Sequence, residues 1–143
     1  MMASGALAAA AEKKFKAISV IVMDATGREL VAKTQPDCPP LIPHIARAKA
    51  GATIGTHSNS RAIKDKYLPD RLAQLLSMAT IGSEVGLPFA AVPGGVLLRD
   101  GDGDIVGSVG VSGASADEDE HCAIMGGKAA VGIVTEPAKS ALE

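Results

Sequence analysis

The order of hydrophobic and polar positions predicts that the chain begins with a helix and continues into a β-hairpin. Residues 6–16 are rich in strong helix formers, and the apolar residues 2–11, which lack the preceding basic region of a signal peptide, are interpreted as the first turns of the same helix. A β-branched run over residues 17–23 predicts a buried strand, and the alternation over residues 28–34 predicts a half-buried one. The intervening Asp24-Ala25-Thr26-Gly27 is typical of a tight turn, so the two strands are expected to pair antiparallel.

The middle of the chain predicts a proline-initiated helix followed by a polar segment. Apolar residues recur at helical spacing over residues 43–55, where Ile45, Lys49 and Ala52 share one face. Residues 56–65 are polar and are expected to form a loop with at most a short helical turn.

A second central helix is predicted from Pro69 to Gly82. The proline suits its first turn, and Asp70 lies at the positive end of the helix dipole. Its apolar residues recur at helical spacing and predict a buried stripe made of Leu68, Leu72, Leu75, Leu76 and Ala79.

The C-terminal half predicts three strands and a last helix. A short strand is expected at residues 89–91, and strands at 96–99 and 104–111 flank the turn Asp100-Gly101-Asp102-Gly103. Ser115 and Glu118 have the spacing of a capping box, which predicts a helix start. One face of this helix is predicted to carry Cys122, Met125, Ala129 and Ile133.

Glycines within that last helix weaken it by about 1 kcal/mol each relative to alanine. Gly126, Gly127 and Gly132 are therefore best explained if another backbone packs closely against them. The full element order is α-β-β-α-α-β-β-β-α, which predicts a single α+β domain over residues 1–143, built on an antiparallel sheet of about five strands.

The composition of the chain argues against several classes of function. The 143 residues include three aromatic side chains (Phe15, Tyr67 and Phe89), which argues against a base-stacking platform, and the net charge of −2 argues against nucleic-acid binding. No apolar stretch is long enough to cross a membrane. Cys38 and Cys122 are interpreted as free thiols in a reducing, cytoplasmic compartment.

Motifs for other chemistries are incomplete. Asp100, Asp102 and Asp104 resemble the start of a calcium loop, but the glycine and glutamate that such a loop requires are absent, which favours a solvated turn. The glycines of residues 107–113 do not form a dinucleotide-binding pattern, and the acidic start of the next helix would repel a phosphate.

The three histidines differ in their candidate roles. His44 opens a helix, where a polar residue is ordinary, whereas His57 lies in a polar loop in which a ligand site can form. His121 is spaced for a surface ion pair with Asp117. The acidic cluster of residues 117–121 could hold a metal, but a solvated acidic face is the favoured interpretation.

Residues 93–122 contain three distinctive segments: Pro93-Gly94-Gly95-Val96, Gly107-Ser108-Val109-Gly110-Val111-Ser112-Gly113 and Asp119-Glu120. Together they resemble the GlcG/HbpS family, which includes the C-terminal domain of the corrinoid adenosyltransferase PduO. It extends more loosely to the first hairpin and to the helix ending in Gly-Thr-His. It implies a PAS- or profilin-like sheet flanked by helices, a homo-oligomer, and binding of haem or a related tetrapyrrole, with iron handling or haem degradation in some members.

The resemblance also implies candidate site residues. Gly55-Thr56-His57 matches a stretch of the PduO-like branch, and His57 is the first choice for an axial iron ligand because a neutral imidazole coordinates iron. A solvated loop histidine is the competing interpretation. The bend at Gly94 and Gly95 is expected either to shape the backbone near the cofactor cavity or to act structurally.

Haem binding, with or without enzymatic turnover, is thus the leading hypothesis. A cofactor-free oligomeric scaffold or accessory subunit is the alternative, and corrinoid binding is a weaker third. With three aromatics, a haem site here requires aliphatic and glycine walls, with at most Tyr67 or Phe89 nearby. It is expected to be open or to lie between subunits.

Overall fold

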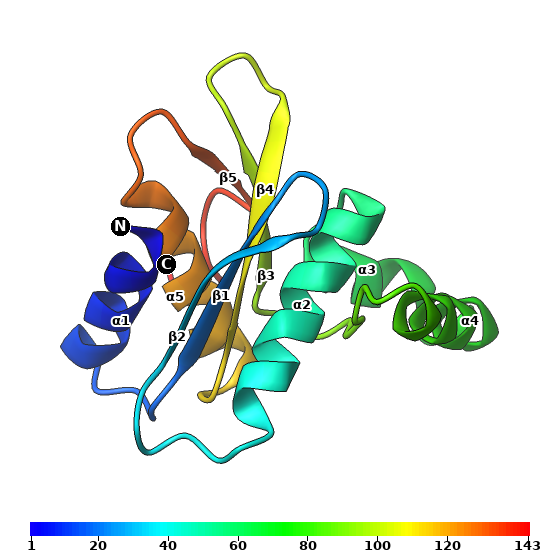
Figure 1. The fold of residues 1–143 in the computed structure, drawn as a ribbon, viewed down its shortest axis with the longest axis horizontal. Helices are drawn as coiled ribbons and strands as arrows, with labels where there is room; N and C mark the ends of the chain where they lie inside the picture. Colours follow the sequence, from blue (N-terminus) through cyan, green and yellow to red (C-terminus); the bar gives the residue numbers. More distant parts are fainter.

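The computed structural model describes residues 1–143 and contains five helices and one five-stranded antiparallel sheet, which confirms the predicted α+β class. The strands lie in the order β2-β1-β4-β3-β5. Helix α2 covers one face of the sheet, α1 and α5 cover the other, and α3 and α4 extend outward beyond α2 (Figure 1). In chain order the elements are α1 (Met2–Glu12), β1 (Ser19–Asp24), β2 (Glu29–Thr34), α2 (Ile42–Thr56), α3 (Ser60–Tyr67), α4 (Leu72–Glu84), β3 (Gly95–Arg99), β4 (Ile105–Ser112), α5 (Ala116–Lys128) and β5 (Val134–Glu136).

Both predicted hairpins form, β1 with β2 and β3 with β4. The first turn is organised by Asp24, whose Oδ1 accepts hydrogen bonds from the N–H groups of Thr26 and Arg28 at 2.9 and 3.0 Å. The predicted half-burial of the second strand is wrong, since all six residues of β2 are exposed. β2 is an edge strand, and the helices pack against the central strands instead.

The close contact between helices α1 and α5 depends on a glycine. A Cβ on Gly126 would lie 2.7 Å from the Met2 carbonyl oxygen, so the expectation that another backbone packs closely is confirmed for this glycine. It is wrong for the other two, because Gly127 packs against the side chains of Thr135 and Leu98, and Gly132 lies beyond the helix with no atom within 4 Å of a Cβ. Helix α1 ends at Glu12, before the predicted Lys16, because Lys14 adopts a left-handed φ of 57° and Phe15 N–H bonds to the Ala10 carbonyl at 2.9 Å. The capping box of α5 is confirmed, but the helix stops at Lys128 and excludes Ile133.

The predicted strand at residues 89–91 is wrong, because these residues have helices rather than strands as neighbours. The segment passes between α2 and α4, and two glycines make room for it. A Cβ on Gly51 of α2 would overlap the Pro88 carbonyl oxygen, and a Cβ on Gly82 of α4 would lie 2.5 Å from the Leu87 carbonyl oxygen. The fifth strand is instead β5, which pairs with β3.

The predicted loop at residues 56–65 is largely helix α3. Asn59 caps its start by accepting a hydrogen bond from Ala62 N–H at 2.9 Å. The helix is amphipathic and buries Ile63 against α2 and α4. The polar composition of this segment led to the prediction of a loop, although an N-cap and a single buried apolar residue, Ile63, are enough to hold a short helix here.

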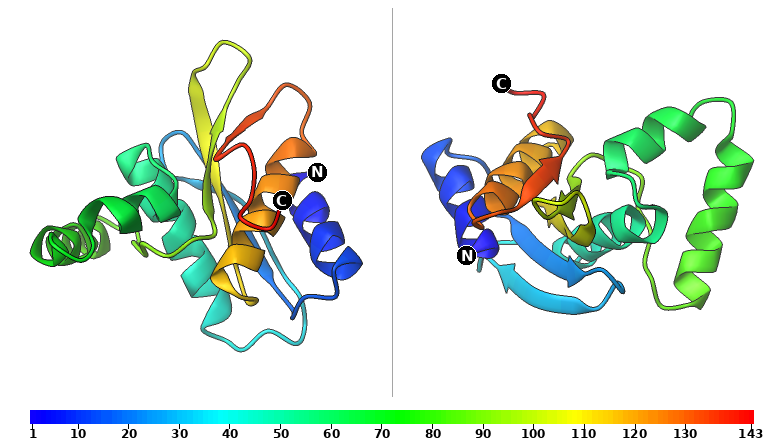
Figure 2. Two further views of the ribbon diagram at one scale, coloured as in Figure 1. Left: turned by 180° about the vertical axis from the view of Figure 1, so that it is seen from behind. Right: turned by 90° about the horizontal axis from the view of Figure 1, so that it is seen from above.

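Helix α4 lies at one end of the molecule, far from the sheet (Figure 2). Of its 13 residues, only Leu75 and Gly82 are buried. The predicted buried stripe is therefore mostly wrong, since Leu68, Leu72 and Leu76 are 37%, 49% and 59% exposed. None of the helices combines the length and the apolar character needed to cross a bilayer.

Candidate functional site

A buried ion pair lies where α2, β4 and α5 meet. Lys49 Nζ donates to Asp119 Oδ2 at 2.8 Å and to the Val111 carbonyl oxygen at 3.0 Å, and both charged side chains are 3% exposed. Gly94 has a φ of +134°, and a Cβ there would lie 2.8 Å from Lys49 Nζ. The glycine therefore leaves the space through which the lysine reaches Asp119.

A second set of charges joins α3 to α5. Arg61 Nε donates to Glu120 Oε2 at 3.0 Å, and the guanidinium also pairs with Asp117. The Glu120 side chain is 2% exposed. These pairs correct the interpretation of residues 117–121 as a solvated acidic face, because Asp119, Glu120 and His121 are all buried.

The electrostatics of this cluster follow from burial. Burial raises the pKa of Asp119, while the Lys49 ion pair and the Ala114 N–H pull it back down. Burial also raises the pKa of the nearby Cys122 thiol to about 12, and the Asp119 charge adds to the rise. The ion pairs of Lys49 and Arg61 with the carboxylates of α5 therefore link helices α2, α3 and α5.

His121 has a different partner from the one predicted. Its Nδ1 lies 2.9 Å from Ser140 Oγ in the C-terminal segment, and Phe15 meets the ring edge-on with 6.3 Å between centroids. The predicted surface pair with Asp117 does not form, because Asp117 turns toward Arg61 while His121 points toward the C-terminal segment.

Predicted site residues do gather at the other end of α2, beside a pocket of about 250 Å³ between α2 and α4. Gly55 and Thr56 line this α2–α4 pocket, and the remaining lining residues are Met78, Ile81, Gly82, Val85, Leu87 and Phe89. His57 follows as the C-cap of α2, with a left-handed φ of 55° and an exposed side chain.

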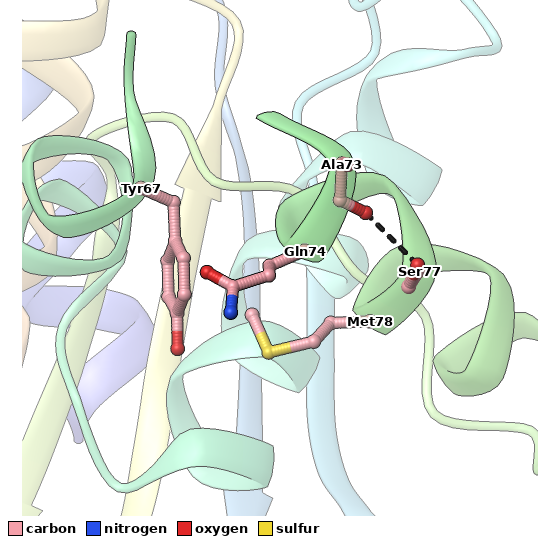
Figure 3. A pocket seen from close by; sticks show the side chains of 5 residues that line it. All are labelled: Tyr67, Ala73, Gln74, Ser77 and Met78. Carbon is pink, nitrogen blue, oxygen red and sulfur yellow. Dashed lines mark hydrogen bonds between the residues drawn. The ribbon is translucent and has the colours of Figure 1, made fainter. Parts of the chain in front are cut away.

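A neighbouring α3–α4 pocket has a volume of about 430 Å³ and is lined by Tyr67, Ala73, Gln74, Ser77 and Met78. Tyr67 faces Gln74 and Met78 across it (Figure 3). Lys66 Nζ lies 5.4 Å from the centroid of the Tyr67 ring. Met78 lines both pockets, so Tyr67 and Phe89, two of the three aromatics, lie around the same helix next to the end of α2.

The structure separates the other two predicted site residues from this pair of pockets. Gly94 packs against Lys49, and Gly95 N–H donates to Ser60 Oγ at 2.7 Å. Both glycines are buried. The Lys49–Asp119 pair was not predicted, although the placement of Lys49 on the same helical face as Ile45 and Ala52 was a signal of its burial.

Comparison with known proteins identifies the family of this chain. The family model described as haem degrading protein HbpS-like matches residues 1–128, and the chain belongs to this family. A search of curated proteins finds no significant match.

Solved structures agree on the fold. The crystal structure described as a PduOC:heme complex is 22% identical, covers 91% of this chain and 89% of its own, and has a TM-score of 0.76. Streptomyces reticuli HbpS, solved as a double mutant, is 26% identical over 90% of this chain and 80% of its own, with a TM-score of 0.74. Klebsiella pneumoniae protein ORFY is 21% identical over 87% and 81%, with a TM-score of 0.72.

Proposed function

We propose that this protein binds haem at the end of α2, with the macrocycle against the α2–α4 pocket and His57 as an axial ligand. The observation that carries the proposal is the position of His57. An exposed imidazole directly follows Gly55 and Thr56, which line an apolar pocket. A neutral imidazole beside an apolar surface is the usual donor arrangement for haem iron.

The side chains present fit an open haem site. No cluster of three His, Cys, Asp or Glu side chains could hold a metal ion. Lone coordination by His57 suits haem, since the porphyrin nitrogens supply the remaining in-plane ligands. The wall is aliphatic apart from Phe89, and at about 250 Å³ the pocket is smaller than the ~300–1,000 Å³ of enclosed ligand sites. It would hold one edge of the macrocycle.

Positive charge near the pockets supports the proposal. Helix α3 carries Lys64 and Lys66 against the single acidic residue Asp65, while its third cation, Arg61, is already paired with Glu120 and Asp117 of α5. Lys66 already lies beside the Tyr67 ring at the α3–α4 pocket. Ammonium groups at this rim would pair with the propionate carboxylates of haem.

The comparisons support the same ligand. The family is described as haem degrading, and one structure of the same fold is described as a complex with haem. When bound, haem supplies iron redox chemistry, and we extend the proposal to haem degradation when dioxygen and an electron donor are provided. This extension predicts that the Soret band is lost and iron is released when the complex is mixed with both reagents.

Haemin titration tests the proposal. We expect a saturable change of the Soret band for the wild type, and a weaker and spectrally shifted complex for His57→Ala. His44→Ala is the matched control, because His44 is an exposed histidine in the first turn of the same helix. Ile81→Glu places a charge on the wall of the α2–α4 pocket and should also weaken binding.

The outcomes test separately whether His57 coordinates the iron and whether the protein binds haem at all. If His57→Ala and His44→Ala bind haemin alike, the assignment of His57 is wrong. If the wild type gives no saturable spectral change, the protein does not bind haem, and the cofactor-free scaffold becomes the better hypothesis.

A further inference from the structure

The α3–α4 pocket is distinct from the pocket proposed to hold the haem macrocycle, and its volume suits a small ligand. At about 430 Å³ it lies within the ~300–1,000 Å³ typical of ligand sites, whereas the α2–α4 pocket does not. Two helices form it, since Tyr67 ends α3 and the four other lining residues lie in the first half of α4. The molecule therefore has room for a second ligand beside helix α4.

The walls of this pocket favour a flat ligand. The Tyr67 ring turns a flat side toward the ends of the Gln74 and Met78 side chains (Figure 3). Aromatic rings stack on one another, and a methionine sulfur makes favourable contacts with aromatic rings. A planar ring held between Tyr67 and Met78 would therefore be stabilised from both sides.

The pocket also presents hydrogen-bonding groups that have no partner within the chain. Ser77 Oγ donates to the Ala73 carbonyl oxygen at 2.9 Å, but neither the Gln74 amide nor the Tyr67 hydroxyl is hydrogen-bonded to another residue. The amide of Gln74 carries donors beside an acceptor. Such an amide forms two hydrogen bonds at once with a ring whose edge carries an acceptor next to a donor, as adenine does.

The aromatic wall is held in place before any ligand arrives. Tyr67 and Met78 pack against a small buried cluster formed by Ala52, Ile63 and Leu75. Arg71 N–H donates to the Tyr67 carbonyl oxygen at 2.7 Å, which fixes the connection between the two helices. Lys66 Nζ lies 5.4 Å from the ring centroid but does not line the pocket, so the side of the ring that faces Gln74 stays open. Such preorganisation lowers the entropic cost of binding.

We propose that the α3–α4 pocket binds a planar nitrogen heterocycle of the nucleobase type, stacked on Tyr67 and hydrogen-bonded along one edge to Gln74. Stacking supplies affinity for any flat ring, and the amide selects an edge with neighbouring donor and acceptor. One aromatic ring serves a single base, although the three aromatics of the chain do not form a platform for a strand. The proposal does not rest on haem binding, and its test is made without haemin.

Isothermal titration calorimetry of the full chain with adenine tests the proposal. We expect saturable binding, and about tenfold weaker binding of purine, which stacks equally well but lacks the amino group that pairs with the Gln74 amide. Adenosine monophosphate distinguishes a free base from a nucleotide as the ligand. Lys66 beside the ring should make the nucleotide bind more tightly than adenine if the phosphate is also recognised.

Fluorescence locates the ligand, because Tyr67 is the only tyrosine of the chain and there is no tryptophan. Adenine stacked on Tyr67 should quench the tyrosine emission, after correction for ligand absorbance, with the same saturation as the calorimetric titration. Calorimetric binding without quenching would place adenine elsewhere and overturn the proposal.

Two pairs of variants test the assigned roles. Gln74→Leu should weaken adenine binding about tenfold, with Thr80→Val as the matched control, since both residues are exposed on α4 and Thr80 does not line the pocket. Tyr67→Leu should weaken binding at least about fivefold, whereas Tyr67→Phe keeps the ring and should retain most of the affinity. Absence of saturable adenine binding, equal binding of purine, or a Gln74→Leu variant that binds as well as Thr80→Val would overturn the proposal.

Discussion

The side chain of Lys49 alone connects three elements of the fold. It joins helix α2 to Asp119 of α5 and to the end of β4, and Gly94 leaves the space that this contact needs. The Pro-Gly-Gly bend that carries part of the family resemblance thus accommodates a buried ion pair. That is a structural reason for a glycine, and it leaves a cofactor role for Gly94 and Gly95 as a prediction.

Replacing Lys49 should show how much the Lys49–Asp119 ion pair contributes to the free energy of unfolding. Lys49→Met leaves Asp119 buried without its partner, which we expect to lower the free energy of unfolding by ~3–5 kcal/mol. Urea denaturation measures the loss, with Lys33→Met on the exposed edge strand as the control. A loss no larger than the control's would show that the pair does not stabilise the fold.

The pH dependence of that variant has a definite sign. Burial already raises the pKa of Asp119, and loss of Lys49 removes an interaction that lowers it. A carboxyl whose pKa is raised in the folded state binds protons more strongly when folded, so the variant should gain stability relative to wild type as the pH falls through that pKa. Urea denaturation between pH 7 and pH 4 measures the difference between the two proteins.

Asp24 has the opposite behaviour. Hydrogen bonds from the Thr26 side chain and from the Arg28 backbone lower its pKa from 3.8 to about 2. The stability that this carboxylate contributes is therefore complete above its unfolded pKa and is lost as the pH falls toward 2. Asp24→Asn should be less stable than wild type at pH 6, and the gap should close near pH 2; a gap independent of pH would contradict the assignment.

At the scale of elements, close backbone contacts decide where helices lie. Helices α1 and α5 cross at Gly5 and Gly126, where a Cβ would meet the neighbouring helix. We expect Gly126→Ala to destabilise the protein, because overpacking costs ~1–3 kcal/mol and exceeds the gain in helix propensity. Thermal unfolding measures the effect, with Gly101→Ala as the control, since no atom lies within 4 Å of a Cβ there. A more stable Gly126→Ala would show that α1 can move away freely.

At the scale of the whole molecule, ligand binding should appear in stability. A ligand that binds only the folded state at 100 times its Kd adds ~2.7 kcal/mol. For a chain of this length that corresponds to an increase in Tm of about 5–10 °C on adding haemin. Differential scanning fluorimetry with a dye whose signal haemin does not quench, or circular dichroism, measures the shift, and His57→Ala should lose most of it. An equal shift in both proteins would place haemin elsewhere on the surface.

Local signals predict structure correctly where the chain itself contains the cause. The capping box of Ser115 and Glu118, the turn at Asp24, and the two hairpins depend on neighbouring residues, and all were predicted. Helix α3 was missed despite its local Asn59 cap, and most other errors occurred where a distant element decided the outcome. Residues 89–91 have strand-like composition but lie between α2 and α4, and Asp119 and Glu120 of α5 are buried as partners of Lys49 and Arg61.

The candidate site was likewise predicted in part: its motif residues could be found in the sequence, but the side chains around them could not. Gly55, Thr56 and His57 were singled out from a motif, but which side chains surround them depends on the position of α4. That position is set by Gly51 and Gly82, which admit the connecting segment between two helices. The contact has no sequence pattern, because the two glycines lie on different helices and each faces the connecting segment rather than a chain neighbour.

The sequence by itself determined the class of the fold, the two hairpin turns, the capped start of α5 and the family, because these follow from local hydrogen bonding, from the spacing of apolar residues and from short motifs. Only the tertiary structure decided which polar groups are buried and which apolar ones are not. Burial depends on what packs opposite a residue, so Lys49 and Glu120 lie inside while Leu72 and Leu76 face outward. The same reason makes the uncovered face of α4 visible only in the folded chain.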